Sequence, residues 1–429
     1  MTIHENYPGT EDRSRFTEDI RRFEFQTNLP LRHRIGIIWR LVLLVSVIAG
    51  IIALSVLLIS IINDSFGYAA IEYKVHPSSL SLNGRPLNEL SCSEIVLLLE
   101  DHLTANRLRQ LESENPFSTR SLEDCHETAI FEISKPKAVV TWSLFYSLKY
   151  SRELKIYVAQ KYPDADLVFQ NWLNSDFIRS PQSSDPLRTG ILTAIMGSIY
   201  VIGIVIVVAF PVGIAAAIYL EEYSSRSFLH KIIQTNINNL AGVPSIIYGM
   251  LGLALFVRAL EPLTSGAIFG LSDSTTANGR TILSAGLTLA LLVLPVIIIN
   301  AQEAIRAVPN SLRQASYGMG ATKWQTVWHH VLPNAIPGIL TGTILSVSRA
   351  FGETAPLVVV GASTYITFNP ESIFSKFTTI PIQIYQWTAR PQDVYKNIAA
   401  AAIIVLLVLL LTLNATAIIL RNRLSRRLI

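Results

Sequence analysis

The chain has 429 residues, of which 50% are hydrophobic and 15% are charged, against roughly 25% charged residues in a soluble domain. The mean hydropathy of +0.39 points to membrane-spanning segments. The formal net charge is only +4, which excludes the strongly basic composition of a nucleic-acid-binding protein.

Six long apolar runs predict six transmembrane helices. The first, Leu41–Ile62, is uncharged and would be about 33 Å long as a helix, enough to cross a hydrocarbon core of about 30 Å. The other runs are Ile191–Leu220, Ile232–Val257, Thr281–Gln302, Ile336–Gly361 and Asn397–Leu420. Because Ile191–Leu220 is too long for one perpendicular crossing, we expect an additional short helix at its start.

Lysines and arginines near the ends of the runs set the predicted orientation. They precede the first run, lie between the fourth and fifth, and follow the last: Arg32, Arg34, Arg40, Arg306, Arg313, Lys323, Arg421, Arg423, Arg426 and Arg427. Both termini are therefore predicted to be cytoplasmic, as an even number of spans requires. We expect a cytoplasmic tail over residues 1–35, a first transmembrane helix over 36–63 and a second cytoplasmic tail over 422–429.

Residues 64–188 form a predicted extracytoplasmic insert of domain size. Apolar residues at helical spacing over Glu94–Leu111 predict an amphipathic helix. The β-branched and aromatic residues of Val139–Thr141 and Ser143–Tyr150 predict a strand. Together these patterns indicate a small α+β module.

The only two cysteines of the chain, Cys92 and Cys125, both lie in this insert. The predicted topology places them outside the cytoplasm, where disulfides form and persist. We therefore predict a disulfide between them, with two unpaired thiols as the alternative. The role of the insert stays open: it docks a partner protein, braces another membrane subunit or only fills space.

Motifs of nucleotide, metal and hydrolase chemistry are missing from the sequence. It contains no G-x-x-x-x-G-K-[ST] P-loop, and Gly318–Lys323 lacks the third glycine and the preceding strand of such a loop. H-E-x-x-H, C-x-x-C and G-x-S-x-G are also missing. The sequence therefore predicts no catalytic residue, no metal and no cofactor, and gives no reason to expect an enzyme.

The segment between the fourth and fifth runs, residues 303–333, has a helix–turn–helix pattern. It predicts a short helix, a glycine turn, a second short helix, and prolines where the fifth span starts: Ser311–Tyr317, Gly318 and Gly320, Thr322–Val331, and Pro333 and Pro337. Spacing alone does not distinguish this segment from an ordinary helical hairpin.

This segment resembles the loop of permeases of ATP-binding-cassette importers. Those permeases carry Glu-Ala-Ala, a glycine after three further residues, and Ile-x-Leu-Pro nine residues beyond. The resemblance implies a coupling helix that docks into a groove on the ATPase. Gln314 replaces the acidic residue and His330 the isoleucine, so a charged contact at Gln314 is not implied. The implied coupling residues are Gln314, Ala315, Ser316, Gly320, Lys323, Leu332 and Pro333.

Three further segments resemble the permeases of phosphate importers. The Ala-Pro-Leu that follows Gly-Glu-Thr is similar to the PstA type of these permeases and not to the PstC type. The resemblance is close over residues 169–429 and does not cover most of the insert. The three segments are Asn239–Gly249, Glu303–Pro309 and Arg349–Leu357.

The resemblance implies an all-α polytopic membrane protein with six transmembrane helices. Its ABC-importer permease core spans residues 189–421, and the α+β insert is additional. The implied function is that of a permease subunit of an ATP-driven phosphate importer in the bacterial inner membrane. The implied partners are a second related permease of the PstC type, a dimer of ATP-binding subunits, an extracytoplasmic phosphate-binding protein and membrane lipid, with no nucleic acid.

Two charged residues interrupt the fifth run. Arg349 lies about 20 Å along a helix that starts at Ile336, near mid-membrane. An arginine there costs at least about 2.5–3.5 kcal/mol on insertion scales, so a functional role is expected. Helical spacing predicts one stripe whose glycines let a partner helix come close. Its members are Gly338, Gly342, Ser346, Arg349 and Glu353.

We assign the substrate pathway to Arg349, Glu353, Ser346 and Thr354. The planar guanidinium of Arg349 suits the charge of a passing phosphate, and Glu353 would orient it and keep the anion from binding too tightly. A structural ion pair, or an arginine that snorkels to the interface, is the alternative. A permease for another oxyanion, such as molybdate or sulfate, and a membrane-anchored receptor or sensor that acts through the insert are the competing functions.

Overall fold

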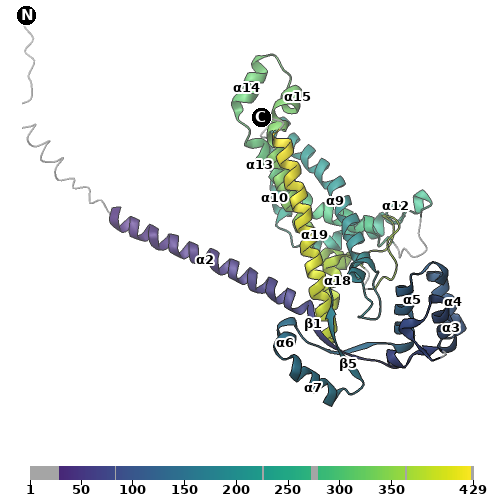
Figure 1. Cartoon of the computed structure of the whole chain (residues 1–429). Coiled ribbons are helices and arrows are strands. Elements are labelled where there is room, and N and C mark those ends of the chain that lie inside the picture. The colour runs from purple at the N-terminus through teal and green to yellow at the C-terminus, as the bar shows by residue number, and fades with distance from the viewer. Residues whose placement is uncertain (1–28, 83, 225–226, 272–278, 363–364, 427–429) are drawn as a thin grey trace, which may run out of the picture. The chain divides into compact units, whose positions relative to one another are not determined.

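The computed structural model of the chain (Figure 1) describes residues 29–82, 84–224, 227–271, 279–362 and 365–426. It contains two compact units, residues 1–60 and 61–429. Residues 1–28 of the predicted N-terminal tail and residues 427–429 of the predicted C-terminal tail lie outside the described residues.

Helix α2 (Leu29–Asp64) connects the first unit to the second. Its 36 residues span about 54 Å, and every side chain from Leu31 to Ser60 is exposed. A helix that is apolar and exposed on all sides is stable where its surroundings are lipid. α2 therefore has the length and the surface of a transmembrane span, and it begins seven residues before position 36.

Five helices among the described residues are long and apolar enough to cross a bilayer. They are α2, α9 (Leu192–Ile218), α13 (Ile282–Arg306), α16 (Leu332–Gly352) and α19 (Asp393–Arg426). A sixth crossing exists if α10 (Phe228–Ala241) and α11 (Ser245–Gly252), which are bent by 104° to each other, count as one broken span. Within the second unit α13 packs against both α9 and α16. The prediction of a polytopic helical protein is confirmed, with one span broken.

The break between α10 and α11 has a local cause. Pro244 has no backbone N–H and disfavours a helical conformation at Val243, so α10 cannot continue through it. The end of α10 leaves carbonyl groups without helical partners. The carbonyl of Leu240 accepts from the backbone N–H of Val243 at 3.1 Å and also from the hydroxyl of Tyr248 at 2.8 Å. The bend is therefore held by a hydrogen bond as well as by the proline.

Two expectations about the spans are wrong. No separate helix precedes α9 within Ile191–Leu220: α9 runs unbroken from Leu192 and continues as a π-helical turn to Tyr223, so the extra length lies at the other end.

The second helix of the loop does not end at Val331 either. α15 (Lys323–Thr326) passes through a π-helical turn into α16, and Pro333, which lacks an N–H, is accommodated just after that turn.

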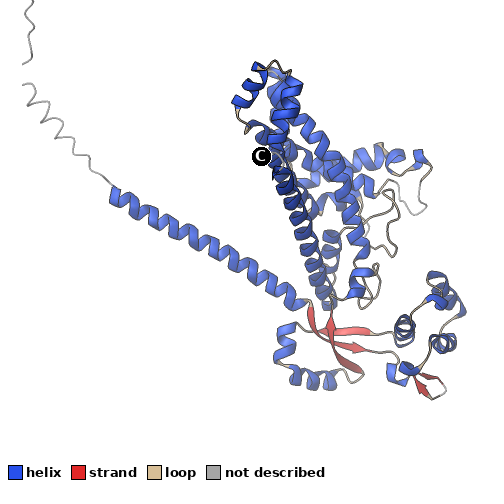
Figure 2. Cartoon of the chain, turned by 45° about the horizontal axis from the view of Figure 1, so that its top comes forward, coloured by secondary structure: helices blue, strands red, loops and turns tan. Residues whose placement is uncertain are grey.

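The insert contains a three-stranded antiparallel sheet in the order β4–β1–β5 (Figure 2). The strands are β1 (Phe66–Glu72), β4 (Lys137–Thr141) and β5 (Ala165–Asn171), with Tyr68 opposite Phe169. The predicted strand over Val139–Thr141 is confirmed. The strand over Ser143–Tyr150 is wrong, because these residues form α6 (Leu144–Lys149). Here a tertiary contact outweighs the β propensity: the Tyr68 N–H donates to the buried Ser147 hydroxyl at 2.9 Å.

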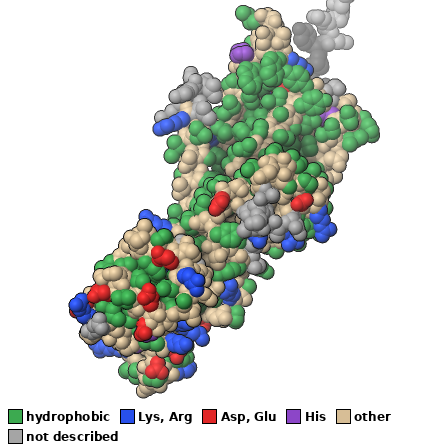
Figure 3. Space-filling view, turned by 90° about the vertical axis from the view of Figure 1, so that its right-hand side faces the viewer, with side chains coloured by type: hydrophobic (Ala, Val, Ile, Leu, Met, Phe, Trp, Pro, Cys, Tyr) green, Lys and Arg blue, Asp and Glu red, His purple; other side chains and the backbone are tan. Residues whose placement is uncertain are grey.

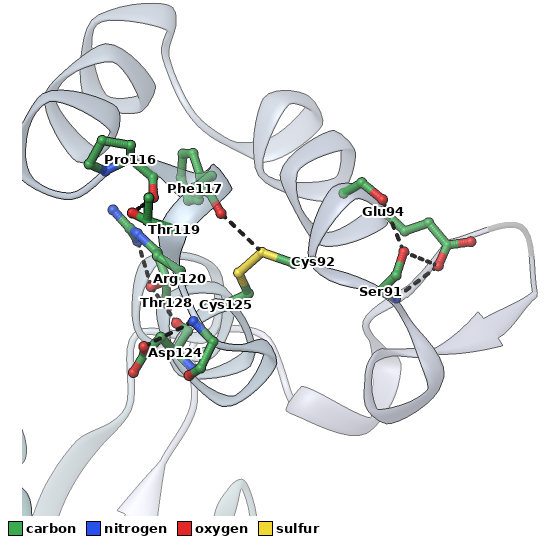
Figure 4. The surroundings of a disulfide bond; sticks show 12 residues. Ser91, Cys92, Glu94, Pro116, Phe117, Thr119, Arg120, Asp124, Cys125 and Thr128 are labelled. Carbon is green, nitrogen blue, oxygen red and sulfur yellow. Dashed lines mark hydrogen bonds between the residues drawn. A yellow bond between two sulfur atoms is a disulfide. The ribbon is translucent and has the colours of Figure 1, made fainter.

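A separate hydrophobic cluster lies beneath three helices of the insert, α3 (Cys92–His102), α4 (Ala105–Glu114) and α5 (Leu122–Ala129). The single helix predicted over Glu94–Leu111 is thus two helices, which break at Leu103–Thr104. The predicted disulfide joins Cys92 on α3 to Cys125 on α5, with 5.6 Å between the Cα atoms (Figure 4). Closing a loop of this length stabilises the fold by roughly 3–4 kcal/mol in the chain-entropy model.

Short elements complete the described structure: β2 (Ser81–Leu82), β3 (Arg85–Pro86), α7 (Ser151–Lys161), α8 (Ser175–Arg179), α12 (Glu261–Thr264), α14 (Asn310–Gly318), α17 (Ala355–Val360) and α18 (Ile380–Thr388). Figure 3 shows hydrophobic side chains over the helical bundle, whereas acidic and basic side chains gather on the insert. This difference in surface chemistry matches a bundle surrounded by lipid and an insert that faces water.

Candidate functional site

Arg349 lies in the last turn of α16, beside the middle of α13. It lines a small cavity together with Leu292, Val293 and Val296, which lie near the centre of the 25-residue helix α13. α16 begins four residues earlier than Ile336, so counting along the predicted helix misjudged the position of Arg349 within it. Helix α13 indicates the depth of Arg349 better, because the residues beside it lie near the centre of α13. This supports a location of Arg349 near the middle of the membrane span.

Arg349 pairs with Glu353, but not along one helix. The Arg349 Nε lies 3.5 Å from the Glu353 Oε1, and the side chains are 59% and 18% exposed. α16 ends at Gly352, and Glu353 has an extended backbone with φ −74° and ψ 125°. The prediction that Glu353 continues the helical stripe is therefore wrong. More than half of the Arg349 side chain is exposed at the surface of the chain.

The small residues of the stripe pack inside the chain. A Cβ added at Gly338 would lie 2.8 Å from the Cβ of Ala304, and one added at Gly342 would lie 2.4 Å from that of Asn300. Both glycines thus allow the close approach of α13, so their partner helix belongs to this same chain. Ser346 is buried, and its hydroxyl donates to the Gly342 carbonyl at 2.9 Å.

Ser346 and Arg349 line one cavity, whose other walls come from both sides of the α10–α11 break and from α13. The cavity volume is about 10 Å³, about the space that one water molecule needs. An oxyanion the size of phosphate does not fit inside it in this conformation. The exposed side of Arg349 is therefore the side at which an anion can approach.

Thr354 lies apart from that cavity, at the N-terminal end of α17. Its carbonyl accepts from the Val358 N–H at 3.0 Å. α17 packs closely on α11, since a Cβ on Gly249 would lie 2.6 Å from the Cα of Pro356. Two of the segments that carry the family resemblance, Asn239–Gly249 and Arg349–Leu357, thus meet in space, and this contact accounts for a glycine in one and a proline in the other.

The loop between α13 and α16 folds as a tight hairpin of α14 and α15. Gly320 has φ +82°, a left-handed conformation that favours glycine. Its N–H donates to the Tyr317 carbonyl at 2.9 Å, and the Ala321 N–H donates to the Ser316 carbonyl at 3.2 Å. The hydroxyls of Ser316 and Thr326 lie 2.8 Å apart and join the two helices. This hairpin has the compact shape expected of a coupling element.

The predicted coupling residues fall into two groups. Ser316 is buried within the hairpin, and Leu332 and Pro333 are half-buried where the long helix begins. The others are exposed on the outside of the hairpin: Gln314, Ala315, Gly320 and Lys323. Only the exposed group is available to a docking partner, whereas the buried group shapes the hairpin.

Three large apolar side chains on the same hairpin escaped the sequence reasoning. Met319 is 89% exposed, and Trp324 and Trp328, at 57% and 53%, stack with their ring centroids 5.4 Å apart. Exposed apolar side chains at the tip of a polar hairpin are typical of a surface that a partner covers. Two tryptophans four residues apart in a loop were the pattern that could have revealed them.

Two ion pairs join the end of α13 and the loop to the π-helical turn that follows α9. They were not predicted from the sequence. Arg306 pairs with Glu221 at 2.6 Å. Arg313 pairs with Glu222 at 2.8 Å, and these side chains are only 13% and 7% exposed. Arg313 also donates to the carbonyls of Ile305 and Val308. The sequence contained one indication of these ion pairs: two adjacent glutamates directly follow a long uncharged run.

Comparison with known proteins identifies the family of the chain. The profile of the family "binding-protein-dependent transport system inner membrane component" matches residues 209–429. The chain is 34% identical over 239 residues to the phosphate transport system permease protein PstA 1 of Mycobacterium tuberculosis (strain CDC 1551 / Oshkosh), covering 56% of this chain and 72% of that protein.

A second relative is the phosphate transport system permease protein PstA of Haemophilus influenzae (strain ATCC 51907 / DSM 11121 / KW20 / Rd), 31% identical, covering 53% of this chain and 74% of that protein. A chain of a crystallised bacterial alginate ABC transporter is 18% identical, with a TM-score of 0.44, covering 66% of this chain and 90% of that one. The family match spans half of the sequence and includes the loop, the broken span and Arg349. The chain therefore belongs to the family of inner-membrane components of binding-protein-dependent transport systems.

Proposed function

We propose that the chain is a permease subunit of an ATP-driven phosphate importer and forms half of the translocation pathway. The observation that carries this proposal is Arg349, whose charge lies beside the middle of a membrane span and is 59% exposed toward the outside of the chain. Such a charge is costly in lipid, so the exposed side of Arg349 requires a polar lining from elsewhere. The two relatives described above carry phosphate transport in their names.

The chemistry of Arg349 and Glu353 favours phosphate over other oxyanions. A guanidinium offers several donors in one plane and binds oxyanions in two-pronged fashion. A monoprotonated phosphate can also donate to the carboxylate of Glu353, whereas sulfate has no proton to give. One arginine does not balance a dianion. The second permease should therefore supply a matching positive charge across the pathway.

As an inner-membrane permease of an ABC importer, the chain works with another permease, an ATPase and a binding protein, and ATP hydrolysis belongs to the separate subunit. In our proposal the second permease is of the PstC type and the binding protein carries phosphate. A dimer of ATP-binding subunits docks on the hairpin through its exposed residues, Gln314, Ala315, Gly320 and Lys323. The proposal also places both termini and the hairpin in the cytoplasm, because loops rich in lysine and arginine stay on that side of the membrane.

The proposed division of the chain keeps residues 64–188 as an extracytoplasmic insert and residues 189–421 as the permease core. The hydrogen bonds at the base of the insert support this boundary: the Asn397 side chain, in the first turn of α19, donates to the carbonyl of Asp64 at 2.6 Å. The start of the last span and the end of the first are thus joined where the insert begins.

Uptake of radiolabelled phosphate by the assembled complex tests the proposal. Arg349→Gln should abolish uptake while all subunits still assemble in the membrane, because the exposed guanidinium contributes little to folding. Arg421→Gln is the matched control: it removes an arginine of α19 that donates to the hydroxyl of Thr341, in the middle of α16, at 3.1 Å. Near-normal phosphate uptake by Arg349→Gln would remove this residue from the pathway. Uptake of sulfate or molybdate in preference to phosphate by the unaltered complex would reassign the substrate.

A further inference from the structure

One face of the insert is more apolar than a water-facing module requires. Six large apolar side chains of α6, α7 and β5 are exposed, from 42% to 67% of their surface. They are Phe145, Tyr146, Leu148, Ile156, Tyr157 and Phe169. Single exposed apolar residues are ordinary, but a group on neighbouring elements marks a surface that something covers. We call this group the aromatic face of the insert.

Hydrogen bonds tie the aromatic face to the ends of two membrane spans. The Phe145 N–H, at the start of α6, donates to the side-chain oxygen of Asn63 in the last turn of α2 at 2.8 Å. The Thr141 hydroxyl, at the end of β4, donates to the side-chain oxygen of Asn397 in the first turn of α19 at 2.7 Å. A span ends at the bilayer surface, so α6 begins at the level of that surface.

The ring types on this face suit that level. Tyr68 packs edge-on against Phe169, Trp142 packs edge-on against Tyr157, and their ring centroids lie 5.6 Å and 6.3 Å apart. Tyr146 and Tyr150 are also in ring contact, at 4.8 Å. Tyrosine and tryptophan are enriched where a protein crosses from hydrocarbon to water, because each has an apolar ring and a polar tip.

The charge on α6 and α7 is positive. Residues 144–161 contain four basic residues and one acidic residue, Glu153, for a net charge of +3 (4 − 1). The ammonium groups of Lys149 and Lys161 lie 5.1 Å and 5.3 Å from the rings of Tyr150 and Tyr157. Basic residues next to exposed aromatic rings are characteristic of helices that lie in the headgroup region of a bilayer.

We propose that the aromatic face rests in the headgroup region of the external leaflet and binds anionic phospholipid. α6 and α7 then lie on the membrane beside the spans and hold the base of the insert at a fixed height. The other lobe of the insert, built on α3 to α5, has its own core and disulfide. It reaches into water, where the substrate-loaded binding protein arrives.

Spin-label accessibility in the complete complex tests this placement. Phe145→Cys and Leu97→Cys each introduce one labelling site, and the native disulfide stays closed. Phe145 and Leu97 are matched, since both are apolar and exposed, at 59% and 55%, but Leu97 lies on α3. In nanodiscs that contain phosphatidylglycerol, the label at 145 should be more accessible to oxygen and less accessible to a water-soluble nickel chelate than the label at 97.

Two outcomes overturn the proposal. Equal access of the nickel chelate to both labels would place the aromatic face in water. Low access of both oxygen and the chelate at 145 would place it against another protein subunit. The charge component has its own test: replacing phosphatidylglycerol by phosphatidylcholine should raise chelate access at 145 and leave position 97 unchanged. Insensitivity of position 145 to this replacement would contradict binding of anionic lipid.

Discussion

Two arginine–glutamate ion pairs in this chain differ in their burial and in the distance between their charged atoms. Arg313 and Glu222 lie 2.8 Å apart, are almost fully buried, and are reinforced by two backbone carbonyls that accept from the same guanidinium. Arg349 and Glu353 lie 3.5 Å apart, and the arginine is more than half exposed. The guanidinium of the first pair makes four hydrogen bonds within the chain, whereas that of the second is left more than half exposed to another molecule. The comparison separates an arginine that holds the fold from one that we propose to serve transport.

The largest effect on stability should come from Arg313→Gln. It leaves Glu222 buried without its ion-pair partner, and breaking a buried pair costs about 3–5 kcal/mol. The hairpin of α14 and α15 should then detach from the end of α9, and less complex should assemble. Thermal unfolding of the purified complex and the yield of bound ATPase subunit measure this. Full assembly of the Arg313→Gln complex with an unchanged unfolding temperature would show that the Arg313–Glu222 pair does not hold the fold.

Arg349→Lys should impair phosphate uptake and leave stability unchanged. Lysine keeps the charge but loses the planar arrangement of donors. A hydrogen bond to a charged group is worth about 1.5–3 kcal/mol, which corresponds to a loss of roughly ten- to a hundredfold in the rate of uptake. The same substitution at position 313 serves as the comparison. It should lower the unfolding temperature, because the two carbonyl contacts require the guanidinium.

Gly320→Val tests the hairpin itself. The position has space for a side chain, since no other atom lies within 4 Å of an added Cβ, but its φ of +82° is strained for valine. That strain costs roughly 1–2 kcal/mol, so the protein should still insert into the membrane with an altered turn. ATP hydrolysis should then continue without matching phosphate uptake. Normal coupling in this variant would exclude the turn from the coupling mechanism, and Gly318→Ala, at a position with ordinary φ, is the mild control.

The smallest effect should follow Glu353→Gln. A partly exposed ion pair contributes only about 0–1 kcal/mol, and glutamine keeps a side-chain oxygen near the Arg349 Nε. Uptake should fall a few-fold at most if Glu353 only orients the arginine. A loss as complete as that of Arg349→Gln, measured in the same uptake assay, would instead give Glu353 a direct part in binding the anion.

The sequence was informative where composition alone decides the outcome. Charge-free runs located the spans, because a charge inside lipid is costly, and two cysteines in an external segment fixed one another as partners. The sequence was less informative where the structure at one residue depends on contacts with residues far away in the chain. Counting along a predicted helix gave no reason for α16 to end at Gly352, or for Ser147 to bond to Tyr68 and favour a helix over a strand.

The loop shows the same limit. Arg306 and Arg313 were interpretable as markers of orientation, but their partners Glu221 and Glu222 lie about 90 residues earlier in the chain. A single sequence gives no means of pairing residues at such separation. Exposure is equally hidden from it, which is why Trp324 and Trp328 were missed although the helix, the glycine turn and the start of the second helix were predicted.

The helix that begins at Lys323 and ends at Gly352 joins the hairpin to Arg349 without a flexible connection. Trp324 and Arg349 lie 25 residues apart, about 38 Å along the helix axis. If the ATPase docks on the hairpin as proposed, this helix transmits motion from the docking site to the middle of the membrane. A tilt of about 10° around its hairpin end would carry Arg349 through about 7 Å, more than the length of a helical turn. The subunit therefore needs no relay of intermediate contacts to move Arg349 when the hairpin moves.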